Sequence, residues 1–339
     1  MRSAALGIAA IAASLAAASI AWGQAANFYR GKAVDLEIGY SVGGGYDVYA
    51  RMVAPHMGKH IPGNPTLVAK NMEGAGSLRL ANWIYNVAPK DGTAFGTIGR
   101  GTGFDPLFGH RGAQFDGGKF TWLGSANDEV SVCVVWNGRT KITKFDDLLT
   151  TPLTVGGTSA AADTDQFPLV LNGALGTKMK VVTGYPGGND VNLAMERGEV
   201  DGRCGWSWSS VITTRPAWVK DKKITILVQL ALNKHPELPD VPLITDLAKN
   251  EEQRQILTLI FARQALGRPY LAPPGIPADR VEALRTAFME TMRDKAFLAE
   301  AEKAQLEITP IDGAAVQKLV AELYQSPPAV VKRAAELLK

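Results

Sequence analysis

Short apolar runs alternate with segments of helical periodicity along most of the chain. In residues 34–40, apolar residues at every second position alternate with Asp, Glu and Gly, which is the pattern of a strand. In the segment that follows, Tyr46, Tyr49 and Val53 fall on one face of a helix, and Pro55 indicates that this helix is bent. Strand–helix alternation of this kind predicts an α/β fold with largely parallel sheets.

The same alternation continues to the last third of the chain, which becomes helical. The further strands are predicted at residues 93–98, 130–136, 153–156, 181–184 and 224–230. Helices are predicted between them, and two apolar stripes of helical spacing follow near residues 281–292 and 316–323.

The length of 339 residues exceeds what one hydrophobic core usually holds, so two lobes are expected. No low-complexity linker separates two halves, and we therefore expect the chain to cross between the lobes more than once. We place lobe 1 at residues 27–125 and 229–339 and lobe 2 at residues 126–228, with crossings near 124–128 and 225–230 and a cleft between the lobes.

The N-terminus has the pattern of a cleavable secretory signal peptide, which we place at residues 1–25. One basic residue, Arg2, precedes a run of Ala, Ile, Leu, Ser and Gly, and no charged side chain follows before Arg30. A retained membrane anchor is the alternative, but alanine is a weak driver of insertion and a spanning helix needs about 20 strongly apolar residues. The pattern therefore predicts export from the cytoplasm.

The amino-acid composition excludes some classes of binding partner. The formal net charge of +3 is too small to indicate a nucleic acid or an acidic membrane as partner. Cys133 and Cys204 are the only cysteines. In an oxidising compartment such a pair can form a disulfide or remain as two buried thiols, and the sequence leaves both open.

A glycine-rich segment, Ser-Val-Gly-Gly-Gly-Tyr-Asp at residues 41–47, joins the first predicted strand to the first predicted helix. Glycines let the backbone approach a ligand closely, and the amides and dipole of a helix N-terminus favour an anion. The segment matches neither the dinucleotide-binding fingerprint nor the P-loop, so a nucleotide is disfavoured. A plain strand-to-helix turn is the alternative.

Similar junctions recur at residues 156–164, which are rich in hydroxyls and alanines, and at residues 185–190. Two such helix starts facing each other across a cleft would hold one carboxylate by backbone and hydroxyl donors. Arg100, between two glycines and near Thr102, is a natural bidentate partner for a carboxylate, with a surface arginine as the alternative. Trp206 either walls a pocket or packs inside a lobe.

Signals for catalysis are weak. The four histidines lie in no zinc-protease motif, and only His56 and His60 share a helical i, i+4 spacing, which a solvated helix face explains better than a metal site. No nucleophile elbow is present. We therefore predict a binding protein that is not an enzyme, with no catalytic residue, metal ligand or cofactor.

Motifs in a fixed order give the chain a resemblance to a known family. They are residues 28–32 (FYRGK), 41–47 (SVGGGYD), 71–77 (NMEGAGS), 88–93 (APKDGT), 185–188 (YPGG), 197–201 (RGEVD), 238–242 (LPDVP) and 272–277 (APPGIP). The set resembles the receptor family of tripartite tricarboxylate transporters, the Bug-type periplasmic solute-binding proteins, over roughly residues 28–335.

The resemblance implies a two-lobed type II periplasmic binding protein, or Venus flytrap, with a mixed, mostly parallel sheet in each lobe. It implies a monomer in the periplasm that captures a small organic carboxylate and delivers it to one large and one small integral membrane subunit. A binding protein that serves a sensor or signalling partner is the alternative. The identity of the carboxylate stays open.

Motif matching also implies which residues contact the ligand. The first loop would contribute Ser41, Gly44, Gly45, Tyr46 and Asp47; the second loop Thr158, Ser159, Ala162, Asp163 and Thr164; and the border of the pocket Tyr185, Gly187 and Gly188. To these we add Arg100, Thr102 and Trp206. Tyr46 stands where the family often has Thr, and the second loop is richer in alanine than usual. Arg100 and the cysteine pair are not family features, and we predict that Arg100 binds a distal anionic group.

Overall fold

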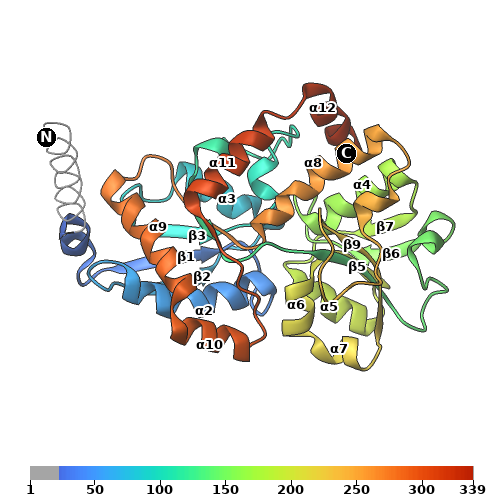
Figure 1. Ribbon diagram of the computed structural model, residues 1–339, viewed down its shortest axis with the longest axis horizontal. Coiled ribbons are helices and arrows are strands. Elements are labelled where there is room, and N and C mark those ends of the chain that lie inside the picture. Colours follow the sequence, from blue (N-terminus) through green and yellow to red (C-terminus); the bar gives the residue numbers. More distant parts are fainter. Residues whose placement is uncertain (1–22, 339) are drawn as a thin grey trace, which may run out of the picture.

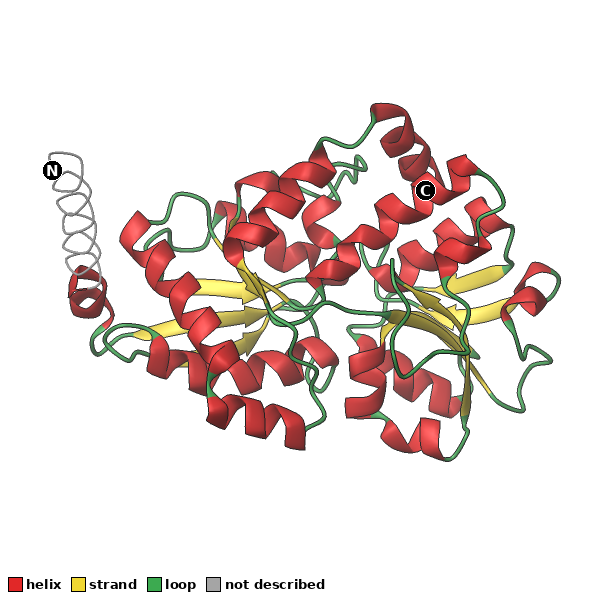
Figure 2. Cartoon of the chain, in the orientation of Figure 1, coloured by secondary structure: helices red, strands yellow, loops and turns green. Residues whose placement is uncertain are grey.

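The computed structural model describes residues 23–338, and the predicted signal peptide lies almost entirely outside them. Two β-sheets lie side by side, each with helices on both faces (Figures 1 and 2). No helix within the described part is long and apolar enough to cross a membrane.

The first sheet has the strand order β11-β4-β10-β3-β1-β2. Its strands are β1 (Ala33–Ile38), β2 (Thr66–Asn71), β3 (Ala94–Thr97), β4 (Thr121–Ser125), β10 (Pro269–Ala272) and β11 (Ile311–Asp312). Strand β1 pairs in parallel with β2 and β3, whereas β10 runs antiparallel to β3 and β4, and β11 runs antiparallel to β4.

The second sheet has the order β7-β6-β8-β5-β9. Its strands are β5 (Ser131–Trp136), β6 (Leu153–Gly156), β7 (Met179–Val182), β8 (Gly202–Ser207) and β9 (Ile224–Leu230). Strand β6 is parallel to β7 and β8, and β5 is antiparallel to β8 and β9. The prediction of two mixed sheets is confirmed, but parallel pairs do not dominate, because the strands next to the crossings pair antiparallel.

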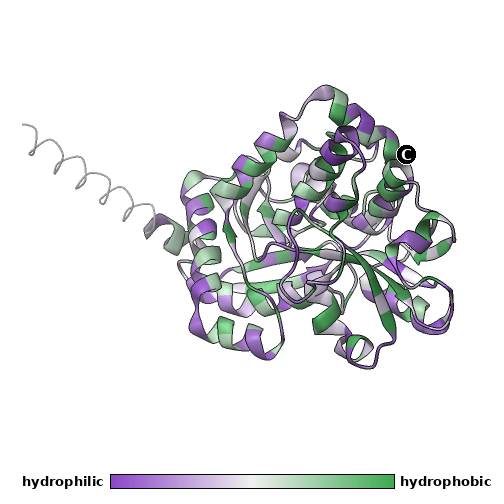
Figure 3. Cartoon of the chain, turned by 45° about the vertical axis from the view of Figure 1, so that its right-hand side comes forward, coloured by the Kyte–Doolittle hydropathy of each residue, from purple (hydrophilic) through white to green (hydrophobic). Residues whose placement is uncertain are grey.

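Helices cover the first sheet from both sides. They are α2 (Gly45–His60), α3 (Leu78–Asn86), α9 (Ala278–Arg293), α10 (Lys295–Lys303) and α11 (Gly313–Tyr324). Helices α2, α9 and α10 share one apolar core with the strands, and α3 and α11 contribute to another. Figure 3 shows hydrophobic colour along the strands and hydrophilic colour on the outer turns.

The second sheet has its own helical layers. The helices are α4 (Asp163–Leu175), α5 (Gly188–Arg197), α6 (Trp208–Thr214), α7 (Pro216–Lys220), α8 (Glu251–Phe261) and α12 (Pro328–Leu337). The described chain also has a helix at residues 23–29. Its short 3₁₀ turns are η1 (Ala75–Ser77), η2 (Thr102–Phe104), η3 (Gly117–Lys119), η4 (Phe145–Leu149), η5 (Ile244–Leu247) and η6 (Ala262–Leu266).

Two crossing segments run side by side between the sheets. One follows β4 and the other precedes β10, and the backbone N–H of Ala126, Glu129 and Gly267 donate to carbonyls of the opposite segment at 2.8–3.0 Å. Helix α8 packs on α4, and α12 packs on both. We propose that the lobes follow the sheets, with residues 231–266 and α12 placed in the second lobe instead of the first.

A β-bulge interrupts the pairing of β5 with β8. Val132 lies opposite Trp206 and Val134 opposite Arg203, so β8 has one extra residue. Cys133 and Cys204 lie within the bulge and are joined by a disulfide. The extra residue places Arg203 and Trp206 on the same side of the strand, with the guanidinium 4.7 Å from the centre of the indole ring.

Gly205 makes this bulge possible. Its φ of +78° lies in the left-handed region, and a Cβ at this position would lie 2.8 Å from the carbonyl oxygen of Asp163. Because the neighbouring atom belongs to the backbone, it cannot move aside without shifting the start of α4.

We predict that Gly205→Ala lowers the melting temperature more than Gly275→Ala does. Gly275 also has a positive φ, +84°, but a Cβ at this position would have no atom within 4 Å, so its replacement costs only about 1–2 kcal/mol for the backbone conformation. Thermal unfolding of the two variants tests this, and equal melting temperatures would contradict it.

Candidate ligand-binding site

A pocket lies between the lobes and contains about 480 Å³ of space, its open mouth included. The first lobe lines it with Tyr40, Gly44, Gly45, Tyr46 and Arg100. The second lobe lines it with Thr158, Ala162, Asp163, Thr164, Gly188, Arg203, Gly205, Ser207 and Ser210.

Three helices begin at this pocket, namely α2 at Gly45, α4 at Asp163 and α5 at Gly188. None of the three has a side chain that caps its first amides among the described residues. The first N–H groups of a helix have no partner inside the helix, and with the dipole they attract an anion. The pocket is therefore surrounded by backbone donors from both lobes.

Polar side chains pack directly against the glycine at two of these helix starts. A Cβ at Gly45 would collide with the hydroxyl of Ser210 and approach the guanidinium of Arg268, and a Cβ at Gly188 would collide with Arg203. Because these glycines have no side chain, hydroxyl and guanidinium groups pack close to the first backbone N–H groups of the helices, and the hydrogen-bond donors of both lobes surround one small volume.

Nine of the predicted site residues share this pocket. They are Gly44, Gly45, Tyr46, Arg100, Thr158, Ala162, Asp163, Thr164 and Gly188. That they contact a ligand stays a prediction. The backbone N–H of Thr158 donates to Thr164 Oγ1, and that of Ser159 donates to Asp165 Oδ2, so these two amides already have partners inside the loop.

Seven predicted residues do not line the pocket. Ser41 donates to Asp190 Oδ2 at 2.7 Å across the cleft. Asp47 accepts from Gly43 N and pairs with Arg51. Thr102 is buried, and the Ser159 hydroxyl accepts from an amide of its own loop. Tyr185 donates to Glu199 and Gly187 packs on Ser41. Trp206 lies beneath the guanidinium of Arg203.

The sequence motifs missed five residues of the pocket, and Arg203 is the charged one among them; the others are Tyr40, Gly205, Ser207 and Ser210. The Arg203 side chain is buried, and Nη1 donates to Gly188 O at 2.9 Å and to Asn192 Oδ1 at 3.0 Å. Its Nε is buried with no hydrogen-bond partner, and no carboxylate among residues 23–338 forms an ion pair with it. Burial of an unpaired charge costs several kcal/mol, and an anion bound next to Arg203 would offset that cost.

The surroundings of Arg203 strengthen that conclusion. Burial, with a smaller contribution from the nearby guanidiniums of Arg215, Arg100 and Arg268, lowers the pKa of its guanidinium to about 9, against the opposing effect of Tyr40. An arginine whose electrostatic neighbours are mainly other arginines is stabilised by any negative charge brought next to it. The sequence clue was an arginine within an otherwise apolar and small-residue strand.

The other three buried arginines have carboxylate partners. Arg100 Nε lies 3.0 Å from Asp163 Oδ2, and Arg263 Nη1 lies 3.3 Å from Asp163 Oδ1. Arg268 Nη1 lies 3.3 Å from Glu129 Oε2. Arg100 also donates to Gln264 and Ser207, so it joins the two lobes directly in addition to facing the pocket.

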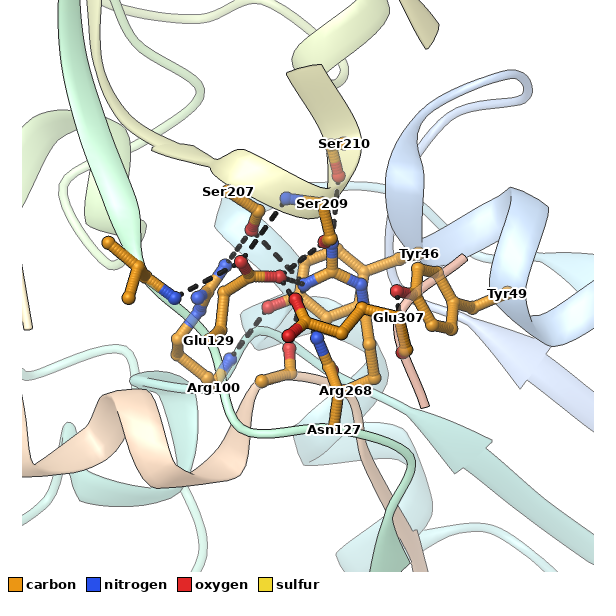
Figure 4. Close-up of polar contacts among 12 residues, drawn as sticks. Tyr46, Tyr49, Arg100, Asn127, Glu129, Ser207, Ser209, Ser210, Arg268 and Glu307 are labelled. Carbon is orange, nitrogen blue, oxygen red and sulfur yellow. Dashed lines mark hydrogen bonds and ion pairs between the residues drawn. The ribbon is translucent and has the colours of Figure 1, made fainter. Parts of the chain in front are cut away.

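Figure 4 shows how the start of α6 is tied to the crossing segments. Arg268 donates to the hydroxyls of Ser207, Ser209 and Ser210, and its guanidinium lies 4.9 Å from the centre of the Tyr46 ring. Glu129 accepts from the Ser209 hydroxyl. The serines that follow β8 are thus held in place by residues of both lobes.

Comparison with known proteins gives matches at the level of structure. BugD, a periplasmic binding protein, matches with a TM-score of 0.71 and 19% identity over 90% of this chain and 98% of its own. MatC (Rpa3494) from Rhodopseudomonas palustris with bound malate matches with a TM-score of 0.70 and 17% identity, covering 91% and 99%. R. palustris Rpa4515 with adipate matches with a TM-score of 0.70 and 17% identity, over 90% of this chain and 97% of its own.

No protein-family model and no curated protein sequence matches the chain. At identities below 20% the structural matches establish the fold. The chain has the two-lobed α/β fold of periplasmic binding proteins, as the resemblance implied.

Asp105 is a second buried ionisable group, close to the guanidinium of Arg263. It is 1% exposed, its Oδ1 accepts from Gln166 Nε2 at 3.1 Å, and its Oδ2 has no partner among the described residues. Burial raises the pKa of this carboxyl from 3.8 to about 8, against the opposing effect of Arg263. The folded protein therefore holds a proton here that the unfolded chain releases near pH 4.

This proton gives the free energy of unfolding a defined pH dependence. Between pH 4 and 8 the folded state binds one more proton than the unfolded state, so stability falls as the pH rises through this window. Asp105→Asn removes the titration. We predict that the stability of the variant relative to wild type increases by more than about 1 kcal/mol from pH 5 to pH 8.

Urea denaturation at the two pH values measures this difference. Asp221→Asn replaces an exposed carboxyl and is the matched control. The difference between its free energy of unfolding and that of wild type should be the same at both pH values. An equally constant offset for Asp105→Asn would show that Asp105 is ionised in the folded protein.

Proposed function

We propose that this protein is a periplasmic solute-binding receptor that captures a small organic carboxylate for a membrane transporter of the tripartite tricarboxylate type. The observation that carries the proposal is the buried guanidinium of Arg203, which lines the pocket between the lobes and has no carboxylate partner among the described residues. A carboxylate fits the fork of an arginine through two parallel hydrogen bonds.

The uncapped starts of α2, α4 and α5 support the same conclusion, because their amides add donors from both lobes. Tyr40 and Tyr46 stack at 4.7 Å and form an aromatic wall beside these donors. A carboxylate bound here would contact both lobes at once and would favour the closed arrangement, which is how a two-lobed receptor signals that it is loaded.

The comparisons support the ligand class. MatC carries malate and Rpa4515 carries adipate, both organic acids, and each shares the fold over nearly its whole length. Together with the secretory pattern of residues 1–25, this favours a receptor in the periplasm that hands its solute to one large and one small integral membrane subunit. In this role the solute leaves chemically unchanged, and no residue of the pocket acts as a catalyst.

We predict that Arg203→Gln weakens binding of the cognate carboxylate by about 100-fold or more, since loss of one partner of a buried ion pair costs roughly 2–5 kcal/mol. The ligand is first found by thermal-shift screening of the mature protein against mono-, di- and tricarboxylates, aromatic acids and amino acids. A ligand at 100 times its Kd adds about 2.7 kcal/mol of stability.

The free variant supplies an internal check. Since Arg203→Gln removes an unpaired buried charge, the ligand-free variant should melt no lower than wild type. Arg139→Gln is the matched control, because Arg139 also lies 4.7 Å from a tryptophan ring, that of Trp136, but outside the pocket. Unchanged affinity in Arg203→Gln, or no ligand in the whole panel, would contradict the proposal.

A further inference from the structure

The charges buried around the pocket do not balance. Arg100, Arg203, Arg263 and Arg268 are 3%, 8%, 2% and 1% exposed. Two carboxylates pair with them, Asp163 with Arg100 and Arg263, and Glu129 with Arg268. Four positive charges thus meet two negative ones, which leaves a surplus of two positive charges within the described protein.

Other nearby carboxylates do not remove this surplus. Asp47 is buried and pairs with the half-exposed Arg51 within α2. Asp165 accepts from Ser159 N and the Thr164 hydroxyl within the second loop and forms no ion pair in the described chain. Asp105 forms none either, and burial keeps it largely protonated at neutral pH.

The two surplus charges face the pocket at different places. One belongs to Arg203, which has used two of its five N–H donors. The other lies in the group formed by Arg100, Asp163 and Arg263, where two guanidiniums share one carboxylate. Arg100 is the member of that pair that lines the pocket, and two of its five donors are still available after Gln264, Ser207 and Asp163.

The pocket offers no position for an ammonium group. Asp163 is the one carboxylate that lines it in the described structure, and each of its oxygens faces a guanidinium. The Tyr46 ring stacks on Tyr40 and also lies under the guanidinium of Arg268, so it is already engaged by a cation. A ligand amine would add a fifth cation without a counter-charge.

We propose that the pocket selects a small dicarboxylate without an ammonium group, and rejects both monocarboxylates and amino diacids. One carboxylate would bind Arg203 and the other would lie against Arg100. The inference rests on the proposed function and specifies its ligand class. A monocarboxylate leaves one buried guanidinium without a counter-charge. An amino diacid supplies two negative charges but adds one positive charge. Each therefore neutralises only part of the surplus positive charge of the pocket.

The experiment is calorimetric titration of the mature wild-type protein with acids of matched length. The aliphatic sets are succinate, butyrate and aspartate; glutarate, valerate and glutamate; and adipate, hexanoate and 2-aminoadipate. Terephthalate and benzoate form an aromatic pair, and inorganic phosphate and sulfate test dianions that are not carboxylates. In the set that binds most tightly, the diacid should bind at least 100-fold more tightly than its monoacid and its amino diacid.

A second measurement ties the selectivity to the charge surplus. Arg203→Gln reduces the surplus from two to one, so the ratio of diacid to monoacid affinity should fall at least tenfold, while Arg139→Gln should keep the wild-type ratio. A purely structural effect of the substitution would weaken both acids equally and leave the ratio unchanged, which would overturn the inference.

The outcomes separate this inference from the proposed function. A monoacid or amino diacid that binds within tenfold of its diacid overturns the inference and leaves a carboxylate receptor. Binding of phosphate or sulfate with no binding of any carboxylate overturns both and assigns the pocket to an inorganic dianion. No binding of any compound also overturns both.

Discussion

The burial of Arg203 without a carboxylate partner is the constraint around which the cleft is organised. The side chain is held by Gly188, Asn192 and the Trp206 ring, and these contacts fix its direction but supply no negative charge. Retaining such a group costs stability in the free protein. The proposed binding function accounts for that cost, because a bound anion would recover it.

The same electrostatics connects the two lobes. Arg100 of the first lobe contacts Asp163 and Ser207 of the second, and Ser41 contacts Asp190. At the crossing segments, Arg268 and Glu129 hold the serines at the start of α6. Positive charge from both lobes therefore surrounds one small volume, and an anion between them would offset the repulsion among the guanidiniums.

The sequence predicted much of the fold because local patterns carry it. Periodicity located β1, β5, β6 and β9, and the glycine-rich junctions precede helices α2, α4 and α5, which start at the pocket. The balance of parallel and antiparallel pairs was not predictable, because it depends on where the chain returns from the other lobe. For the same reason, the placement of α8 and α12 could not be read from local pattern.

The site was predicted only in part. Loop motifs pointed to Gly45, Tyr46 and Asp163, which line the pocket, but Arg203 and Ser207 are positioned by tertiary structure. The bulge at Gly205 puts two residues three apart on one side of a strand, which the ordinary alternation of side chains does not allow. Arg100 was singled out from the sequence and lines the pocket, but its contacts across the cleft depend on residues far away in the sequence.

The most direct test is a crystal structure of the mature protein with its tightest-binding carboxylate. The account predicts that two oxygens of one carboxylate accept hydrogen bonds from the Arg203 guanidinium at about 2.7–2.9 Å. A structure in which the ligand lies elsewhere, and Arg203 is paired with a carboxylate of the protein itself, would contradict it.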